Sequence, residues 1–182
     1  LYTNSEDYER RFSAKIDDIS YDDKYIFDDL AYNFLPSEIS AAFALIQLKK
    51  LETNIQKRIN NFNFLKDNLS YSNNFFIPTN YNNVQTGWLA FPLIFTNKLA
   101  NKRKEIQIFL EKEGIQTRTI FTGNIMRQPV AQKFKWDHYG SFEVSDEVMK
   151  SGILLGSHNR QSQENLEYII LKIKEAEKQF SG

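Results

Sequence analysis

Residues 32–69 constrain the fold most, because their apolar side chains recur at the spacing of one helical face. Most gaps between them are of three or four positions, or sums of the two. Pro36 suits the first turn of a helix, and Glu38 favours the positive end of the helix dipole. The pattern predicts one helix ending near Leu69, roughly 45–50 Å long. Because a small domain cannot cover such a length, we expect one end to pack on something else. The apolar positions are Ile39, Phe43, Ile46, Leu51, Ile55, Ile59, Phe62, Leu65 and Leu69.

Residues 1–29 are polar and rich in acidic pairs, with few consecutive apolar side chains. We expect residues 1–30 to be an extended lead-in, with about one helical turn near Tyr8–Phe12, ahead of a domain formed by residues 31–182. The pairs Asp17-Asp18 and Asp22-Asp23 lack the glycine and the spacing of a calcium loop, so a solvated surface is favoured. Because the chain begins at Leu1 and not at methionine, we expect it to be a fragment of a longer protein.

The remaining chain alternates short apolar runs with helical patterns, which predicts an α+β fold. The expected elements are a strand at Phe75–Ile77, a strand at Gly87–Phe95, a helix at Asn101–Glu113 stopped by Gly114, a strand at Ile115–Phe121, a helix at Asp146–Lys150 capped by Ser145, a strand at Ile153–Gly156, and a last helix capped by Ser162. Pro92 places its strand at a sheet edge or a bulge. We therefore predict a long helix and a small, mainly antiparallel sheet covered by helices.

Composition excludes several classes of function. Lys and Arg total 23 and Asp and Glu total 23, so net charge gives no reason to expect nucleic acid or an anionic membrane as a partner. No apolar run is long enough to span a bilayer. The absence of cysteine excludes disulfides and cysteine-ligated metals, and two isolated histidines are too few for a typical zinc site. We expect no metal site and a cytoplasmic location.

Two arginines mark a candidate anion site. Arg118 lies on a strand that reads as half-buried, and a buried guanidinium requires an anionic partner. Arg127 follows the turn at Gly123-Asn124 and could complete a clamp on a phosphate or diphosphate. Structural salt bridges are the alternative for both. His158, in the loop after a buried strand, is either a binding group or a partly exposed loop residue.

Two phrases of the sequence carry a resemblance to a known family. Residues 32–42, Tyr-Asn-Phe-Leu-Pro-Ser-Glu-Ile-Ser-Ala-Ala, with Gln47–Leu51, resemble the helix entry of the sugar aminotransferases, vitamin B6 enzymes of the aspartate aminotransferase fold. The phrase from Gly114 to Pro129 is narrower. It resembles the pyridoxamine-phosphate-dependent sugar 3-dehydrases, which make 3,6-dideoxysugars for bacterial O-antigens. The likeness covers about residues 24–180.

The resemblance implies a role for particular residues. Asn33 matches the asparagine that reaches the cofactor phosphate of the neighbouring subunit in a homodimer, although a plain turn or cap residue is the alternative. Arg118, Asn124 and Arg127 match the phrase that borders the nucleotide-sugar site, and His158 falls in the loop that closes the same region. The complete enzyme would use pyridoxamine or pyridoxal phosphate and remove the 3-hydroxyl of a nucleotide-linked 4-keto-6-deoxyhexose.

The resemblance also implies what lies elsewhere. In the dehydrases a histidine replaces the Schiff-base lysine of the aminotransferases, and it belongs to a large domain upstream of Leu1. We therefore expect this C-terminal domain to be inactive by itself. Leu35 stands where the wider family usually has arginine. Some relatives carry an iron–sulfur cluster whose last cysteine lies shortly before the asparagine; none occurs before Asn33, so we expect no cluster.

Three interpretations remain open at this point. The first is a fragment of a sugar 3-dehydrase. The second is a fragment of a nucleotide-sugar aminotransferase that depends on pyridoxal phosphate. The third is a binding or interaction domain without vitamin B6 chemistry.

Overall fold

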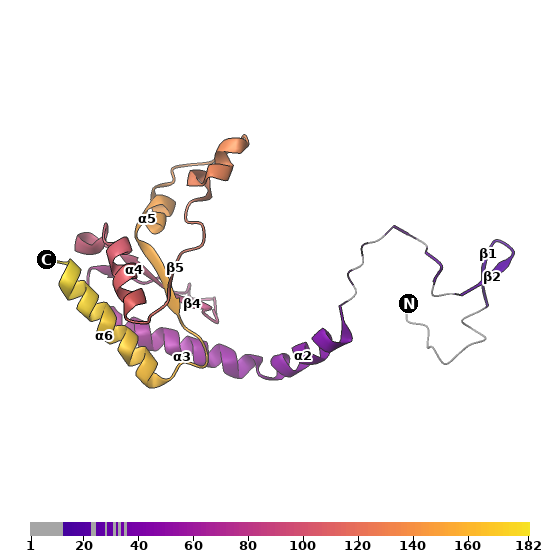
Figure 1. The fold of residues 1–182 in the computed structure, drawn as a ribbon, viewed down its shortest axis with the longest axis horizontal. Helices are drawn as coiled ribbons and strands as arrows, with labels where there is room; N and C mark the ends of the chain where they lie inside the picture. Colours follow the sequence, from indigo (N-terminus) through magenta and orange to yellow (C-terminus); the bar gives the residue numbers. More distant parts are fainter. Residues whose placement is uncertain (1–12, 23–24, 28, 31, 33, 35) are drawn as a thin grey trace. The chain divides into compact units, whose positions relative to one another are not determined.

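The computed structural model describes residues 13–22, 25–27, 29–30, 32, 34 and 36–182 (Figure 1). The chain divides into two compact units, residues 1–45 and residues 46–182. The predicted helical turn near Tyr8–Phe12 and the candidate residue Asn33 lie outside the described residues.

The first unit contains a small hairpin that the sequence analysis missed. Strand β1 (Ala14–Ile16) pairs antiparallel with β2 (Ile19–Tyr21), and Ile16 lies opposite Ile19. The acidic pair Asp17-Asp18 forms the two-residue turn, and Asp17 has a φ of 52°. Aspartate adopts this left-handed conformation more readily than most residues, as such turns require. No sign of this hairpin is visible in the sequence, because three-residue strands are too short to show an alternating pattern.

The single long helix predicted to end near Leu69 is wrong, because the structure has two helices there. Helix α2 (Glu38–Lys49) ends with a hydrogen bond from the Lys50 amide to the Gln47 carbonyl, which spans three residues and not the four of an α-helix. Helix α3 (Leu51–Leu69) begins after Lys50. The sequence carries a sign of the break. Ile46 and Leu51 are five positions apart, a gap that no sum of threes and fours gives. Helix α3 buries Phe62, Leu65 and Leu69, whereas α2 has no buried residue.

The second unit is built on a four-stranded antiparallel sheet, as predicted. Its order is β3 (Phe75–Phe76), β4 (Ala90–Phe95), β6 (Gly152–Gly156) and β5 (Thr117–Thr119). The strands expected at Gly87–Phe95 and Ile115–Phe121 are therefore shorter than their apolar runs. Residues of the edge strand β5 and of the central strand β6 line the candidate site.

Pro92 lies in a strand with neighbours on both sides, yet its own position is a local edge. β3 pairs with Ile94 and Phe95, so its ladder ends before Pro92. The Thr96 amide donates to the Asn74 carbonyl on the β3 side, and backbone groups alternate sides along a strand. The nitrogen of Pro92 therefore also faces the β3 side. Its missing N–H costs no bond to β6. The prediction that this strand lies at a sheet edge or contains a bulge is nevertheless wrong, because β4 lies between β3 and β6 and pairs with β6 in regular register.

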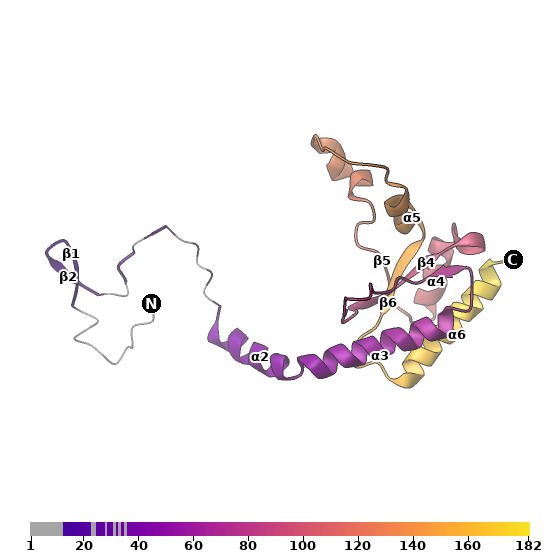
Figure 2. The same ribbon diagram turned by 180° about the vertical axis from the view of Figure 1, so that it is seen from behind.

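Helices cover one face of this sheet (Figures 1 and 2). α3 and α4 (Arg103–Lys112) each contact α6 (Gln163–Phe180), and these helices pack on the strands through one apolar core. Phe91, Ile153 and Leu155 point into that core and are almost completely buried. Residues between them, such as Leu154, therefore lie on the opposite face.

Short connections complete the second unit. They are the 3-10 turns η2 (Asn97–Leu99), η3 (Ile125–Arg127) and η4 (Pro129–Lys133), followed by helix α5 (Glu143–Ser151), which contacts β4 and β6. Ser162 accepts a bond from the Asn165 amide and caps α6 as predicted. Gly114 follows α4 with a φ of 75°, the left-handed conformation that ends a helix.

The predicted cap at Ser145 is wrong. Helix α5 begins at Glu143, because the Asp146 amide already bonds to the Phe142 carbonyl. Ser145 and Asp146 are therefore inside the first turns of the helix, where Asp146 is free to bond elsewhere through its side chain.

Candidate functional site

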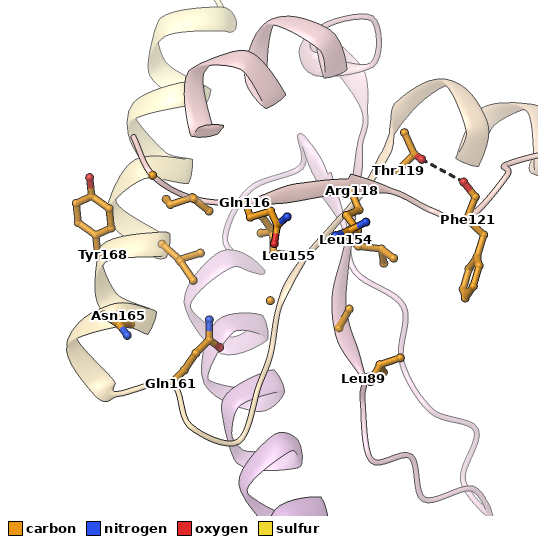
Figure 3. Close-up of a pocket in the computed structure, with 15 residues that line it drawn as sticks. Leu89, Gln116, Arg118, Thr119, Phe121, Leu154, Leu155, Gln161, Asn165 and Tyr168 are labelled. Carbon is orange, nitrogen blue, oxygen red and sulfur yellow. Dashed lines mark hydrogen bonds between the residues drawn. The ribbon is translucent and has the colours of Figure 1, made fainter. Parts of the chain in front are cut away.

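A cavity of about 1020 Å³ lies where β5 and β6 pair (Figure 3). Part of its lining is apolar, from Leu154 and Leu155 of β6 and from Ile169 of α6. Its polar groups come from Gln116, Arg118, Thr119, Gln161, Asn165 and Tyr168. An apolar lining with a few polar groups is typical of small-molecule sites, and the volume lies near the upper end of their range.

The sheet register places Arg118 in this cavity. Arg118 lies opposite Leu154 of β6, on the sheet face away from α4. Its neighbour Thr117 faces the other way and bonds through its hydroxyl to Gln107 and Glu111. The prediction of a half-buried guanidinium is wrong, because β5 is an edge strand and Arg118 is exposed. An exposed arginine in an open cavity can bind an incoming anion without first losing a buried partner.

Arg127 instead makes a two-point ion pair with Asp146. Its Nε lies 2.9 Å from Asp146 Oδ1, and its Nη2 lies 2.6 Å from Oδ2. Asn124, only 4 % exposed, donates to Asp146 Oδ1 at 2.8 Å and accepts from the Met126 amide. Hydrogen bonds from Arg127, the larger cause, and from Asn124 lower the pKa of Asp146 to about 2. Neither Asn124 nor Arg127 lines the cavity, so their role toward a substrate stays a prediction.

His158 is placed beside the cavity but not in its lining. Its Nδ1 accepts a bond from the Arg160 amide at 3.2 Å, and its carbonyl accepts one from Asn61 of α3 at 2.8 Å. Together these bonds shape the loop between β6 and α6 and attach it to α3. Gly156 and Gln161, on either side of His158 in the chain, do line the cavity. The closing role predicted for His158 stays a prediction.

The sequence analysis missed several polar groups of the cavity. Gln116 lies two residues before Arg118 in extended chain, so the two side chains share one face of the sheet. The alternation of side chains along a strand could therefore have predicted Gln116 as a cavity residue. Gln161 gave no such signal. A side chain on Gly156 would begin 3.3 Å from the Nε2 atom of Gln161, so the glycine leaves room for that carboxamide. The Oε1 atom of Gln161 is buried without a hydrogen-bond partner.

The turn after β5 is held from several sides. The Gly123 amide bonds to the Ile120 carbonyl at 2.9 Å, and the Thr119 hydroxyl bonds to the Phe121 carbonyl at 3.1 Å. Gln128 donates to the Thr122 carbonyl at 2.8 Å. Phe121 and Gly123 have positive φ values of 46° and 65°. A β-carbon on Gly123 would lie 2.4 Å from Met149 of α5, so only glycine fits there.

The cavity does not by itself supply a vitamin B6 site. Its described lining residues include neither lysine nor histidine, the two residue types that the resemblance places at the base position. Across the part of the chain that the structure describes, no three metal-ligating side chains lie together. In the same residues, no helix is both long and apolar enough to cross a bilayer.

Comparisons with known proteins agree on one family. A sequence model of the DegT/DnrJ/EryC1/StrS aminotransferase family matches residues 3–174. The lipopolysaccharide biosynthesis protein RfbH of Salmonella typhimurium is 29% identical over 169 residues, covering 91% of this chain and 39% of that protein. The GDP-4-keto-6-deoxy-D-mannose 3-dehydratase of Yersinia pseudotuberculosis is 30% identical over 140 residues, covering 76% and 35%. The chain thus spans less than two fifths of the length of these relatives.

A solved structure shows the same fold. It is a variant of GDP-4-keto-6-deoxymannose-3-dehydratase with bound GDP-perosamine, similar with a TM-score of 0.75 at 24% identity. The match covers 86% of this chain and 40% of that one. The α+β fold predicted from the sequence is therefore confirmed as part of the fold of these enzymes.

The close approach of Gly123 to α5 generates a prediction about stability. Gly123→Ala should lower the free energy of unfolding more than Gly140→Ala, measured by urea denaturation. Both glycines have positive φ, which costs alanine about 1–2 kcal/mol. Only Gly123 adds a clash with Met149, worth about 1–3 kcal/mol more, whereas no described atom lies within 4 Å at Gly140. Equal losses in the two variants would contradict the packing described for the turn.

The ion pair at Asp146 generates a prediction about pH. The pKa of Asp146 falls from 3.8 to about 2 on folding, so its stabilisation is present above about pH 4 and is lost as pH falls toward 2. Asp146→Asn should lower the free energy of unfolding at pH 7, and the difference from the unmodified chain should shrink between pH 4 and 2.

The Arg127→Gln background provides the control for this prediction. There, Asp146→Asn should have a smaller effect at pH 7, because the larger cause of the pKa shift is already gone. A difference between the unmodified chain and the Asp146→Asn variant that stays constant from pH 7 to pH 2 would show that the pair does not stabilise the fold.

Proposed function

The chain belongs to the DegT/DnrJ/EryC1/StrS aminotransferase family, and from this membership we propose that it is the C-terminal domain of a sugar 3-dehydrase that uses pyridoxamine phosphate. The complete enzyme removes the 3-hydroxyl of a nucleotide-linked 4-keto-6-deoxyhexose. The observation that carries the proposal is the 30% identity with a GDP-4-keto-6-deoxy-D-mannose 3-dehydratase over most of this chain. Because that match covers 35% of the relative, the remaining part of the enzyme lies outside these residues.

Within this proposal, the chain's own contribution is to bind the nucleotide-linked part of the substrate. Arg118 supplies a positive charge for the diphosphate, in a cavity large enough for a small molecule. Gln116 and Gln161 offer carboxamides that can donate to and accept from ligand hydroxyls. Leu154, on the same sheet face as Arg118, gives the cavity an apolar surface. These residues bind and orient; none of them transfers a proton in the reaction.

The cofactor belongs mainly to the rest of the proposed enzyme. When bound, pyridoxamine phosphate supplies an amine for the keto group and a ring that withdraws electrons. Asn33 is the residue we propose to reach the cofactor phosphate of a second subunit, which makes the complete enzyme a homodimer. The route served is lipopolysaccharide O-antigen synthesis, and we place the enzyme in the cytoplasm.

Arg127 has a narrower place in the proposal than Arg118. Its two-point pair with Asp146 supports a structural role, since both oxygens of that carboxylate are engaged. Arg127 remains 56% exposed along its side chain and adjoins the same turn. Arg127 can therefore contribute to a diphosphate site in two ways. It can keep its ion pair with Asp146 and add a positive charge nearby, or it can release Asp146 and bind the ligand directly.

An aminotransferase is the second candidate, because the family takes its name from that activity. The two activities differ at one position outside this chain. The base is a histidine in the dehydrases and a lysine in the aminotransferases. Nothing in the cavity of this chain distinguishes them, since the lining holds neither residue.

The coding sequence upstream of residue 1 provides the direct test. We expect it to encode an α/β domain on the order of 200 residues, with histidine where the aminotransferases carry the Schiff-base lysine. The purified complete protein should then consume a nucleotide-linked 4-keto-6-deoxyhexose when supplied with pyridoxamine phosphate, with loss of the 3-hydroxyl followed by NMR. Lysine at that position would favour the aminotransferase, and an upstream sequence without such a domain would refute both.

Substitution of Arg118 tests the substrate site. In the complete protein, Arg118→Ala should weaken binding of the nucleotide-linked sugar by about 1.5–3 kcal/mol, the scale of one charge-assisted hydrogen bond. Isothermal titration calorimetry measures the change. Lys98→Ala is the control, because it removes one positive charge from an exposed turn that does not line the cavity. Equal affinities of the Arg118→Ala and Lys98→Ala proteins would exclude Arg118 from the site.

A further inference from the structure

Phe121 combines features that packing does not explain. It is 85% exposed, yet it lines the cavity that contains Arg118. Its φ of 46° is in the left-handed region, which a bulky side chain rarely adopts. Figure 3 shows its ring at one end of the cavity, with Arg118 between it and Gln116. An apolar ring that is neither buried nor in a relaxed backbone conformation contributes little to the stability of the fold.

The surrounding structure nevertheless fixes this residue. Its carbonyl accepts the Thr119 hydroxyl, a bond drawn in Figure 3. The turn around it is closed by the bond from Gly123 to Ile120, and Gly123 is pressed against Met149. Asn124, which follows Gly123 in the chain, is buried and donates a hydrogen bond to Asp146. Strained residues that a structure over-determines in this way cluster at ligand sites.

The side chains of the cavity restrict which ligands can contact the Phe121 ring. Arg118 and Phe121 are three residues apart, so their α-carbons are at most about 10 Å from each other. A ligand that uses both needs an anionic group at one end and a flat apolar surface at the other. A nucleoside diphosphate has this pattern. Aromatic side chains stack on any of the bases, because every base has a π-face.

We propose that Phe121 is the stacking platform for the nucleobase of a nucleoside diphosphate whose phosphates bind Arg118. This rests on the proposed function, because it assigns a part of the same substrate to the same cavity. The turn after β5 then has a definite purpose. It holds the ring exposed in the unliganded protein, so that the base meets a surface that is already in position.

Calorimetry on the complete protein tests the proposal with GDP, CDP, UDP and dTDP, and then with inorganic pyrophosphate. Phe121→Ala should weaken the tightest of the nucleotides about tenfold, the scale of one base–aromatic stack, and leave pyrophosphate unchanged. Arg118→Ala should weaken both kinds of ligand. Phe121→Tyr keeps the ring face and should bind the nucleotide within about twofold of the original protein.

Two further variants separate stacking from stability. Phe76→Ala is the matched control, because it removes a half-exposed phenyl ring from β3, at the opposite edge of the sheet, and should leave nucleotide affinity unchanged. Phe121→Gly should raise the melting temperature, since glycine adopts positive φ without strain, while it weakens the nucleotide as alanine does. A ring that served only the fold would not give these opposite changes.

The outcomes distinguish this inference from the proposed function. If the original protein binds one nucleotide and Phe121→Ala binds it equally well, the stacking role is wrong and the proposed function stands. If Phe121→Ala changes the sedimentation of the protein and not its nucleotide affinity, the ring belongs to a subunit interface and the stacking role is again wrong. If none of the four nucleotides binds, both proposals fail.

Discussion

The antiparallel ladder between β4 and β6 is the constraint on which the rest of the second unit depends. One face of this ladder is buried by α3, α4 and α6 through residues such as Phe91, Ile153 and Leu155. Because side chains alternate along a strand, burying those residues fixes the opposite direction for Leu154. Pairing with β5 then sets Arg118 beside Leu154. A core interaction thus decides which side chains form the cavity.

The segment after β5 shows how the fold supports the site at its edge. A three-residue strand alone would leave its end poorly fixed. The chain therefore turns sharply at residues 120–123 and is bonded back through Asn124, Arg127 and Asp146. The ion pair of Arg127 with Asp146 holds this loop, whereas the exposed Arg118 provides the positive charge that is available to a ligand. The two arginines of one phrase thus occupy different environments.

Several elements could be predicted from the sequence because their signals are local. Gly114 and Ser162 mark helix ends through their own conformational preferences, and the structure confirms both. The break between α2 and α3 had only the weak sign of the gap from Ile46 to Leu51. The partnership of Arg127 with Asp146 joins residues 19 positions apart, and no local pattern reveals it. Gln161 lies against Gly156, where a β-carbon would be 3.3 Å from its Nε2 atom, and spacing in the sequence does not show this three-dimensional relation.

Pro92 has a consequence for the behaviour of the sheet in solution. β3 ends early, so the neighbouring flank of β4 is a stretch of strand backbone that a foreign strand could extend by hydrogen bonding. Proline removes a donor from that flank, and its ring obstructs the approach of a second backbone. The same residue that costs the ladder nothing internally therefore leaves a foreign strand one donor fewer to pair with.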